Sequence, residues 1–165
     1  EEIEVVTEYK YLGIYIDKDL NWNFNTKSIA SKVNQRVYFL RKLKSFSVRK
    51  ETLLFCYESI IKPIVSFSCL VWLFGLTSQN KMKLTRVMKT ASRVIGLPVK
   101  QLEEIAIAAV MDKLNHIIED ETHPLHEQLV FNRSGRFRLP KMRTNRFRRS
   151  FLPHAMTLYN QEFKR

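Results

Sequence analysis

The chain has 165 residues, of which 45% are hydrophobic and 12% aromatic. Its 28 lysines and arginines outnumber its 16 aspartates and glutamates, giving a formal charge of +12 and a pI near 9.9. This apolar content excludes a generally disordered chain, and the length suits one domain with a sizeable core. The positive charge indicates an anionic partner, either nucleic acid or an acidic membrane surface.

The two cysteines, Cys56 and Cys69, both lie in apolar runs. Two cysteines provide neither a zinc-knuckle spacing nor a disulfide framework, so we expect buried thiols in a reducing compartment. The apolar stretch from Ile60 to Leu76 contains Lys62 and Pro63. It is too short and too interrupted to span a bilayer comfortably. We therefore expect no membrane partner and an intracellular location, nuclear or cytoplasmic.

The N-terminal region is rich in β-branched and aromatic residues. Two such runs, Ile3 to Val6 and Tyr9 to Ile16, are separated by Thr7 and Glu8 and predict a β-hairpin. A glycine inside a strand, here Gly13, indicates a bulge or a close backbone approach.

Two groups of possible metal ligands occur, and neither has a recognised spacing. Asp17 and Asp19 lie two residues apart in a turn sequence with no third carboxylate nearby, which is typical of turn chemistry. His116, His123 and His126 lie near acidic residues, but Pro124 fixes a turn among them. We predict no metal site and no cofactor, with His123 ending a helix.

Helical periodicity and capping residues predict the remaining elements. The first expected helix starts near Asn25 or Thr26. The second runs from about Arg49 to Ile61, and Pro63, where the segment should be kinked or restarted, separates it from a third at Ile64 to Trp72. Two long helices follow, from Thr77 or Ser78 to Gly96 and from about Gln101 to Asp120, and Pro153 opens a short last helix. The predicted fold class is mainly α with a short N-terminal β-hairpin. We divide the chain into the hairpin (1–24), a helical bundle (25–122) and a basic C-terminal segment (123–165).

Five of the six predicted helices have an apolar stripe that should face the core. The stripes are Ile29, Val33, Val37, Leu40 and Leu43; Leu53, Leu54, Tyr57, Ile60 and Ile61; Leu84, Val87, Met88, Ala91, Val94 and Ile95; Leu102, Ile105, Ala106, Ala109, Val110, Leu114, Ile117 and Ile118; and Ala155, Met156, Leu158 and Tyr159. Trp72 and Phe74 lie in an apolar run, which favours core positions over base stacking.

Four basic residues share one side of the helix that ends at Gly96: Lys83, Arg86, Lys89 and Arg93. They fall within roughly a third of the helix circumference at 100° per residue. A helix face that carries only positive charges either contacts phosphates or is simply solvated, and the sequence leaves both interpretations open.

The most basic stretch lies near the C-terminus. From Arg133 to Arg149 it contains eight basic side chains and no acidic one. The basic residues are Arg133, Arg136, Arg138, Lys141, Arg143, Arg146, Arg148 and Arg149. Phe137, Phe147 and Phe151 are interleaved with them. Guanidinium groups pair with phosphate oxygens and aromatic rings stack on bases, which predicts a nucleic-acid contact surface. The alternative is a solvated connector whose phenylalanines dock on the preceding helices.

Short segments at both ends resemble one family of enzymes. At the C-terminal end these are His123-Pro-Leu-His126, Ser134-Gly-Arg136, Arg143-Thr-Asn-Arg146, and Ser150-Phe-x-Pro-x-Ala-Met-x-Leu158. At the N-terminal end they are Tyr9-Lys-Tyr-Leu-Gly-Ile-x-Ile-Asp17 and Leu20-x-Trp22. Together they resemble the part of non-LTR (LINE-type) retrotransposon reverse transcriptases that follows the polymerase active site.

The resemblance implies a function for each part. The hairpin, with Tyr11, Leu12 and Gly13, would be the primer grip, the helices a thumb, and the basic residues contacts to RNA or DNA. The family's Tyr/Phe-Ala-Asp-Asp turn is missing, since the sequence has no Asp-Asp pair. The expectation is therefore a nucleic-acid-gripping fragment, which is not an enzyme on its own and works with the remainder of a reverse transcriptase.

A second, shorter resemblance covers Lys32 to Phe46. This segment is similar to one in the N-terminal region of an alkylation-repair AlkB homologue, but no dioxygenase His-x-Asp motif accompanies it. It implies a shared helix and no shared activity. The alternative to the gripping fragment is a non-catalytic helical interaction module, or a retrotransposon relic without activity.

Overall fold

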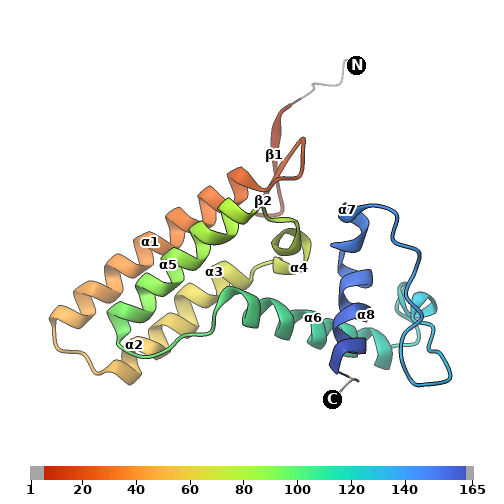
Figure 1. The fold of residues 1–165 in the computed structure, drawn as a ribbon. Helices are drawn as coiled ribbons and strands as arrows, with labels where there is room; N and C mark the ends of the chain where they lie inside the picture. Colours follow the sequence, from red (N-terminus) through yellow and green to blue (C-terminus); the bar gives the residue numbers. More distant parts are fainter. Residues whose placement is uncertain (1–5, 163–165) are drawn as a thin grey trace.

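The computed structural model describes residues 6–162 and is mainly helical, with a two-stranded antiparallel sheet near its N-terminus (Figure 1). This confirms the predicted fold class. The elements are β1 (Glu8–Tyr11), β2 (Ile14–Asp17), α1 (Asn23–Ser45), α2 (Lys50–Cys56), the π-helical turn η1 (Tyr57–Ile61), α3 (Lys62–Ser66), α4 (Cys69–Trp72), the 3₁₀ turn η2 (Leu73–Gly75), α5 (Ser78–Ile95), α6 (Leu102–Glu119), the 3₁₀ turn η3 (His126–Gln128), α7 (Asn145–Arg148) and α8 (Phe151–Glu162).

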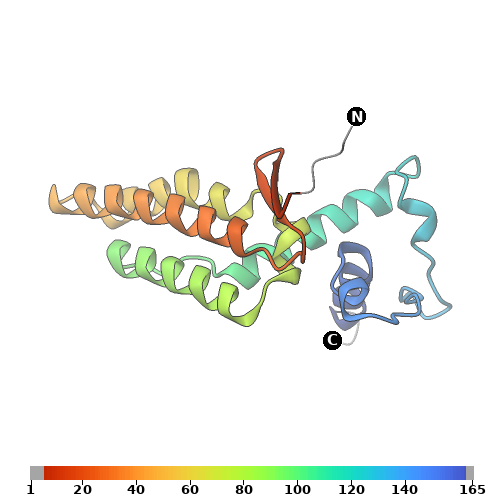
Figure 2. The ribbon, with the colours of Figure 1, turned by 90° about the horizontal axis from the view of Figure 1, so that it is seen from above.

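The helices form an elongated bundle with an arm. In the bundle, α1 lies beside α5, and the α2–α3 segment packs against them (Figure 1). Helix α6 leads out of the bundle to the C-terminal part, where α8 packs on it. The view in Figure 2 shows α1 and α5 side by side, with the C-terminal part at the opposite end of the molecule from the α1 C-terminus.

The hairpin differs from the one predicted. Its strands pair Glu8 with Asp17 and Tyr11 with Ile14, so the turn is Leu12-Gly13, inside the run predicted to be a single strand. Both turn residues have positive φ, 44° for Leu12 and 88° for Gly13, as a two-residue hairpin turn of type I′ requires. Gly13 is therefore a turn residue and the predicted bulge is wrong. Ile3 to Val5 lie outside the described residues.

Helix α1 begins before the predicted caps. The buried Asp17 carboxylate accepts hydrogen bonds from the backbone N–H groups of Asn21 (2.9 Å) and Trp22 (2.8 Å). Trp22 precedes the helix with a φ of 64°. Asn25 and Thr26 are buried within the first turns, so the prediction that either caps the helix is wrong. The turn chemistry expected for Asp17 holds the start of α1 in place.

The segment restarts at Pro63 as predicted, but without a gap: the π-helical turn η1 ends at Ile61, and α3 begins at Lys62 with Pro63 in its first turn. The helical path from Lys50 continues through Pro63 to Ser66, and the chain turns at Ser68, whose φ is 48°. Proline lacks the N–H of the helical ladder and crowds the carbonyl four residues earlier. The π-helical turn immediately before Pro63 loosens the helix where that crowding occurs. Ile60 lies within this turn and is 49% exposed, so the prediction that it is buried is wrong.

Helices α5 and α6 confirm their predicted boundaries. Thr77 caps α5 by accepting a hydrogen bond from the N–H of Asn80, and Gly96 ends it with a φ of 79°. A capping box between Gln101 and Glu104 opens α6. These signals lie within a few residues of each helix end, so local sequence determines them.

The core consists of two hydrophobic clusters. The larger one fills the bundle and includes Trp72, which is fully buried as predicted, and Cys69. The smaller one lies between the second half of α6 and α8, and includes Leu114 and Met156. Helix α6 contributes to both clusters, so the arm has its own small core. The stripes predicted for α1, α5, α6 and α8 are buried or half-buried throughout.

No single helix in residues 6–162 is long and apolar enough to cross a membrane. The segments Lys50–Ser66 and Cys69–Gly75, bent by 44° at the short break between them, are long and apolar enough to do so only when they are taken together. Their side chains at Tyr57, Ile61 and Trp72 are buried in the bundle, which is the usual position of a core helix.

Replacing Tyr57 with phenylalanine should raise the free energy of unfolding by about 1 kcal/mol. The Tyr57 side chain is fully buried, and its hydroxyl has no hydrogen-bond partner among the described residues. Burial, with the nearby Glu58 carboxylate, raises the pKa of this phenol to about 12. Urea unfolding measures the change. The same substitution at Tyr38, which is 53% exposed, is the matched control and should leave stability unchanged.

Candidate nucleic-acid interface

The eight cations of the C-terminal basic run (Arg133, Arg136, Arg138, Lys141, Arg143, Arg146, Arg148 and Arg149) lie in a segment with defined turns. The Asn132 side chain accepts hydrogen bonds from the N–H groups of Ser134 and Arg136, both at 3.0 Å, and closes the turn at Gly135. Thr144 caps α7 by accepting from the N–H of Phe147 at 3.1 Å. These local bonds restrict the backbone that presents the cations.

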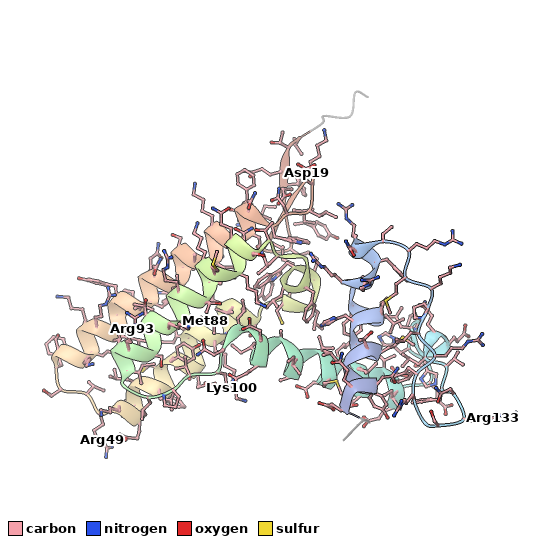
Figure 3. The ribbon with its side chains drawn as sticks, in the orientation of Figure 1. Asp19, Arg49, Met88, Arg93, Lys100 and Arg133 are labelled. Carbon is pink, nitrogen blue, oxygen red and sulfur yellow. The ribbon has the colours of Figure 1, made fainter. Side chains whose placement is uncertain are left out.

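None of the eight cations is paired with a carboxylate in residues 6–162. Seven of them are exposed and Arg136 is half-buried. Within residues 6–162 the ion pairs are Lys62–Glu58 and Lys81–Glu103, and neither involves the run. In Figure 3, Arg133 extends from the end of the molecule that is far from Arg49. Cations without carboxylate partners keep their full charge for phosphate.

The phenylalanines of the run have different roles. Phe137 is 2% exposed, stacks on Phe131 and belongs to the smaller core, and half-buried Phe151 packs against that core. Base stacking by Phe137 is therefore the wrong interpretation and the docking alternative is right for it, while Phe151 also packs against the small core but keeps part of its surface exposed. Phe147 remains 43% exposed.

Asn160 of α8 fastens the run to the small core. Its side-chain oxygen accepts from the N–H of Phe137 at 2.8 Å, and its Nδ2 donates to the carbonyl of Phe137 at 2.9 Å. An isolated antiparallel bridge pairs Phe131 with Phe137. The basic run is therefore fixed to α8 through the backbone of Phe137.

A second basic surface lies on the bundle. Lys83, Arg86, Lys89 and Arg93 are all exposed on α5, as predicted for the outer side of that helix. At the C-terminal ends of α1 and α5, Arg41 and Lys44 join Arg93 around an open groove. The structure thus brings together cations from two helices that are about fifty residues apart in the sequence.

Arg41 and Lys44 are site candidates that the sequence analysis did not select. A sequence signal for them exists: there is no aspartate or glutamate from Leu20 to Lys50, or from Ser59 to Leu102. Helices α1 and α5 both fall in these acid-free stretches, whereas α2 and α6 carry acidic residues. The charge is therefore concentrated on one helix pair.

The basic run reaches the bundle at one point. The Arg146 guanidinium donates to the carbonyl of Asp19 at 3.3 Å. Arg146 and Arg149 line a pocket with Leu20 and Trp22, where the hairpin leads into α1. This contact places the end of the basic run next to the start of the basic helix pair.

The three residues likened to a primer grip form the tip of the hairpin. Tyr11 is 56% and Leu12 77% exposed, and Gly13 completes the turn between them and β2. A large apolar side chain held outward on a tight turn is accessible to a partner.

The histidines are engaged in local contacts. Nδ1 of His126 lies 2.8 Å from the carbonyl of Ile117, and Nδ1 of His123 accepts from the N–H of Leu125 at 3.1 Å. Among residues 6–162, no three histidine, cysteine or acidic side chains are grouped to hold a metal ion.

His154 joins α8 to the bundle, and its burial predicts a pH effect. Its ring packs on Phe74 of η2, with 4.1 Å between centroids, and burial lowers the pKa of His154 below its usual 6.5. When the pKa of a histidine is lower in the folded than in the unfolded state, its full contribution to the free energy of unfolding is present above the unfolded-state pKa. That contribution is lost as pH falls through the folded-state pKa. We expect the unfolding free energy of the native chain to fall below pH 6.5 more steeply than that of His154→Phe, measured by urea unfolding.

Comparison with known proteins gives one partial match. The family model described as "Alkylated DNA repair protein alkB homolog 8, N-terminal" matches residues 22–62, about a quarter of the chain. No curated protein and no solved structure matches. The matched region covers α1, α2 and η1, and it contains the Lys32 to Phe46 segment for which an AlkB-homologue resemblance was noted. The chain is thus similar to that N-terminal region over two helices of the bundle.

Proposed function

We propose that this chain is the nucleic-acid-gripping part of a LINE-type reverse transcriptase, an RNA-directed DNA polymerase, without the catalytic aspartates. The observation that carries the proposal is the anchored basic run, whose eight cations have no carboxylate partner in residues 6–162. Sequence-tolerant grip on RNA or DNA needs this arrangement, because phosphate contacts dominate affinity and carry no sequence information.

The parts have separate roles in this proposal. The hairpin tip, with Tyr11, Leu12 and Gly13, contacts the primer end, and the α1–α5 pair supplies a second set of phosphate contacts. The chain by itself performs no polymerisation, because the metal-holding aspartates belong to the remainder of the polymerase. The resemblance of the two ends of the sequence to this family supports the assignment of roles.

The test is a fluorescence-anisotropy titration with a labelled RNA–DNA hybrid at several salt concentrations. If about five phosphates are neutralised, the logarithm of the affinity should fall with the logarithm of salt concentration at a slope of about −4 to −5. Saturable binding with this slope is the expected result. Weak binding that never saturates, at any salt concentration, would contradict the proposal.

A second candidate function, a helical protein-interaction module, is favoured by one observation. Large apolar side chains are exposed at the far end of the bundle, where Phe39 and Ile60 line an apolar pocket beside Arg36, and Phe55 is 70% exposed. Exposed apolar groups of this size often mark protein contacts. Under this function the hybrid titration would give only weak, non-saturable binding.

A further inference from the structure

A pocket lies between the hairpin turn, the first turns of α1 and the end of α3. Its apolar lining includes Ile14, Ile29 and Ile64, while Ser28 and Lys32 contribute polar groups from α1. Phe67 forms part of its wall and is 54% exposed. A Cβ atom added at Gly13 would lie 3.2 Å from the Phe67 ring, so the hairpin turn closes directly on this phenylalanine.

Asn25 gives the pocket an unused hydrogen-bond donor. The residue is 3% exposed and lines the pocket. Its side-chain oxygen accepts from the N–H of Tyr15 at 3.4 Å, which fixes the amide orientation, and its Nδ2 has no partner among the described residues. An unpaired buried donor is costly, so a ligand oxygen that accepts from this Nδ2 would stabilise the site.

The residues around the pocket select a ligand that has both an anionic group and a ring. Asn25, Ser28 and Lys32 follow one another at helical spacing on the same side of α1, and no acidic residue lines the pocket. The Lys32 ammonium suits a phosphate, the Nδ2 of Asn25 suits a carbonyl or phosphate oxygen, and the apolar wall with Phe67 suits a planar ring. A nucleotide combines these groups.

We propose that this pocket holds one unstacked nucleotide, with its base against Ile64 and Phe67 and its phosphate at Lys32. The Nδ2 of Asn25 donates to an oxygen of that nucleotide, after a small shift of the side chains that shield it from solvent. This inference rests on the proposed function, because the nucleotide is one unit of the gripped strand. It assigns a discrete site in addition to the basic surfaces.

The direct test is an NMR titration of the ¹⁵N-labelled native chain with uridine 5′-monophosphate, adenosine 5′-monophosphate and ribose 5-phosphate. The side-chain amide signals of Asn25 should shift saturably with a nucleotide, and ribose 5-phosphate should bind about tenfold more weakly because it lacks the stacking base. If neither nucleotide shifts the Asn25 amide at millimolar concentrations, or if ribose 5-phosphate binds equally well, the nucleotide pocket is wrong.

Substitutions of the pocket residues provide the second arm. Lys32→Gln and Phe67→Ala should each weaken nucleotide binding about tenfold, the effect of losing one charged contact or one stacking ring. Asn25→Asp keeps the acceptor for Tyr15 but removes the donor and adds a negative charge, so binding should be abolished. Lys18→Gln, an exposed charge loss on the hairpin outside the pocket, is the matched control. Binding by the Lys32 and Phe67 variants equal to that of the control would overturn the proposal.

The outcomes separate this inference from the function on which it rests. A silent Asn25 amide together with salt-steep hybrid binding would remove the pocket and leave the gripping function. A saturable Asn25 shift without hybrid binding would keep the pocket as a mononucleotide site and remove the gripping function.

Discussion

Changing Arg143, Arg146, Arg148 and Arg149 to alanine should make the salt dependence of hybrid binding shallower by roughly three to four units of slope. Each phosphate contact on duplex contributes about 0.9 of a unit, and these four exposed side chains have no carboxylate partner in the described part of the chain. Affinity at low salt should fall by several orders of magnitude. The anisotropy titration with the labelled hybrid measures both quantities.

The matched control removes the same number of positive charges elsewhere. Lys18, Arg49, Lys50 and Lys100 are exposed and lie outside the basic run and the α1–α5 pair. Figure 3 shows Arg49 at the far end of the bundle and Lys100 near the start of α6, both away from Arg133. Their change to alanine lowers the net charge equally and should leave most of the slope intact. Equal losses in both variants would mean that general charge, not the basic run, causes the binding.

The helix ends that could be predicted are those fixed by residues close to them in the sequence. The limits of α5 follow from the Thr77 cap and from Gly96, both of which act within one turn of the helix. The start of α1 was missed because the turn before it is held by Asp17, a residue of the preceding strand, which accepts from the N–H groups of Asn21 and Trp22. The hairpin turn was missed because Leu12 is an unusual residue for a positive φ, so Gly13 alone marks the turn within the strand-like run.

The candidate site was predictable in its charge but not in its shape. A run of arginines without acidic residues is visible in the sequence, and the structure exposes it. Which phenylalanines are buried depends on Asn160, which bonds the backbone of Phe137 across 23 residues. The groove around Arg41 and Arg93 likewise needs α1 and α5 to lie side by side, and only tertiary packing brings them together.

Changing Met156 to alanine should unfold the C-terminal arm while the bundle stays folded. Met156 is 1% exposed in the smaller core, and truncation of a buried methionine costs about 2–5 kcal/mol. A cluster this small has little stability to lose, whereas the bundle has its own larger core. Hydrogen exchange should therefore show lost protection in α8 and retained protection in α5.

The same variant should also weaken hybrid binding, because the basic run loses the anchor that α8 provides through Asn160. A run without that anchor must be ordered when it binds, and this ordering costs free energy. Met82→Ala is the matched control, since Met82 lies on α5 with 63% exposure and its truncation should change neither exchange nor binding. If the Met156 variant loses protection equally in α5 and α8, the two clusters unfold as one cooperative unit, and the basic run depends on the whole bundle.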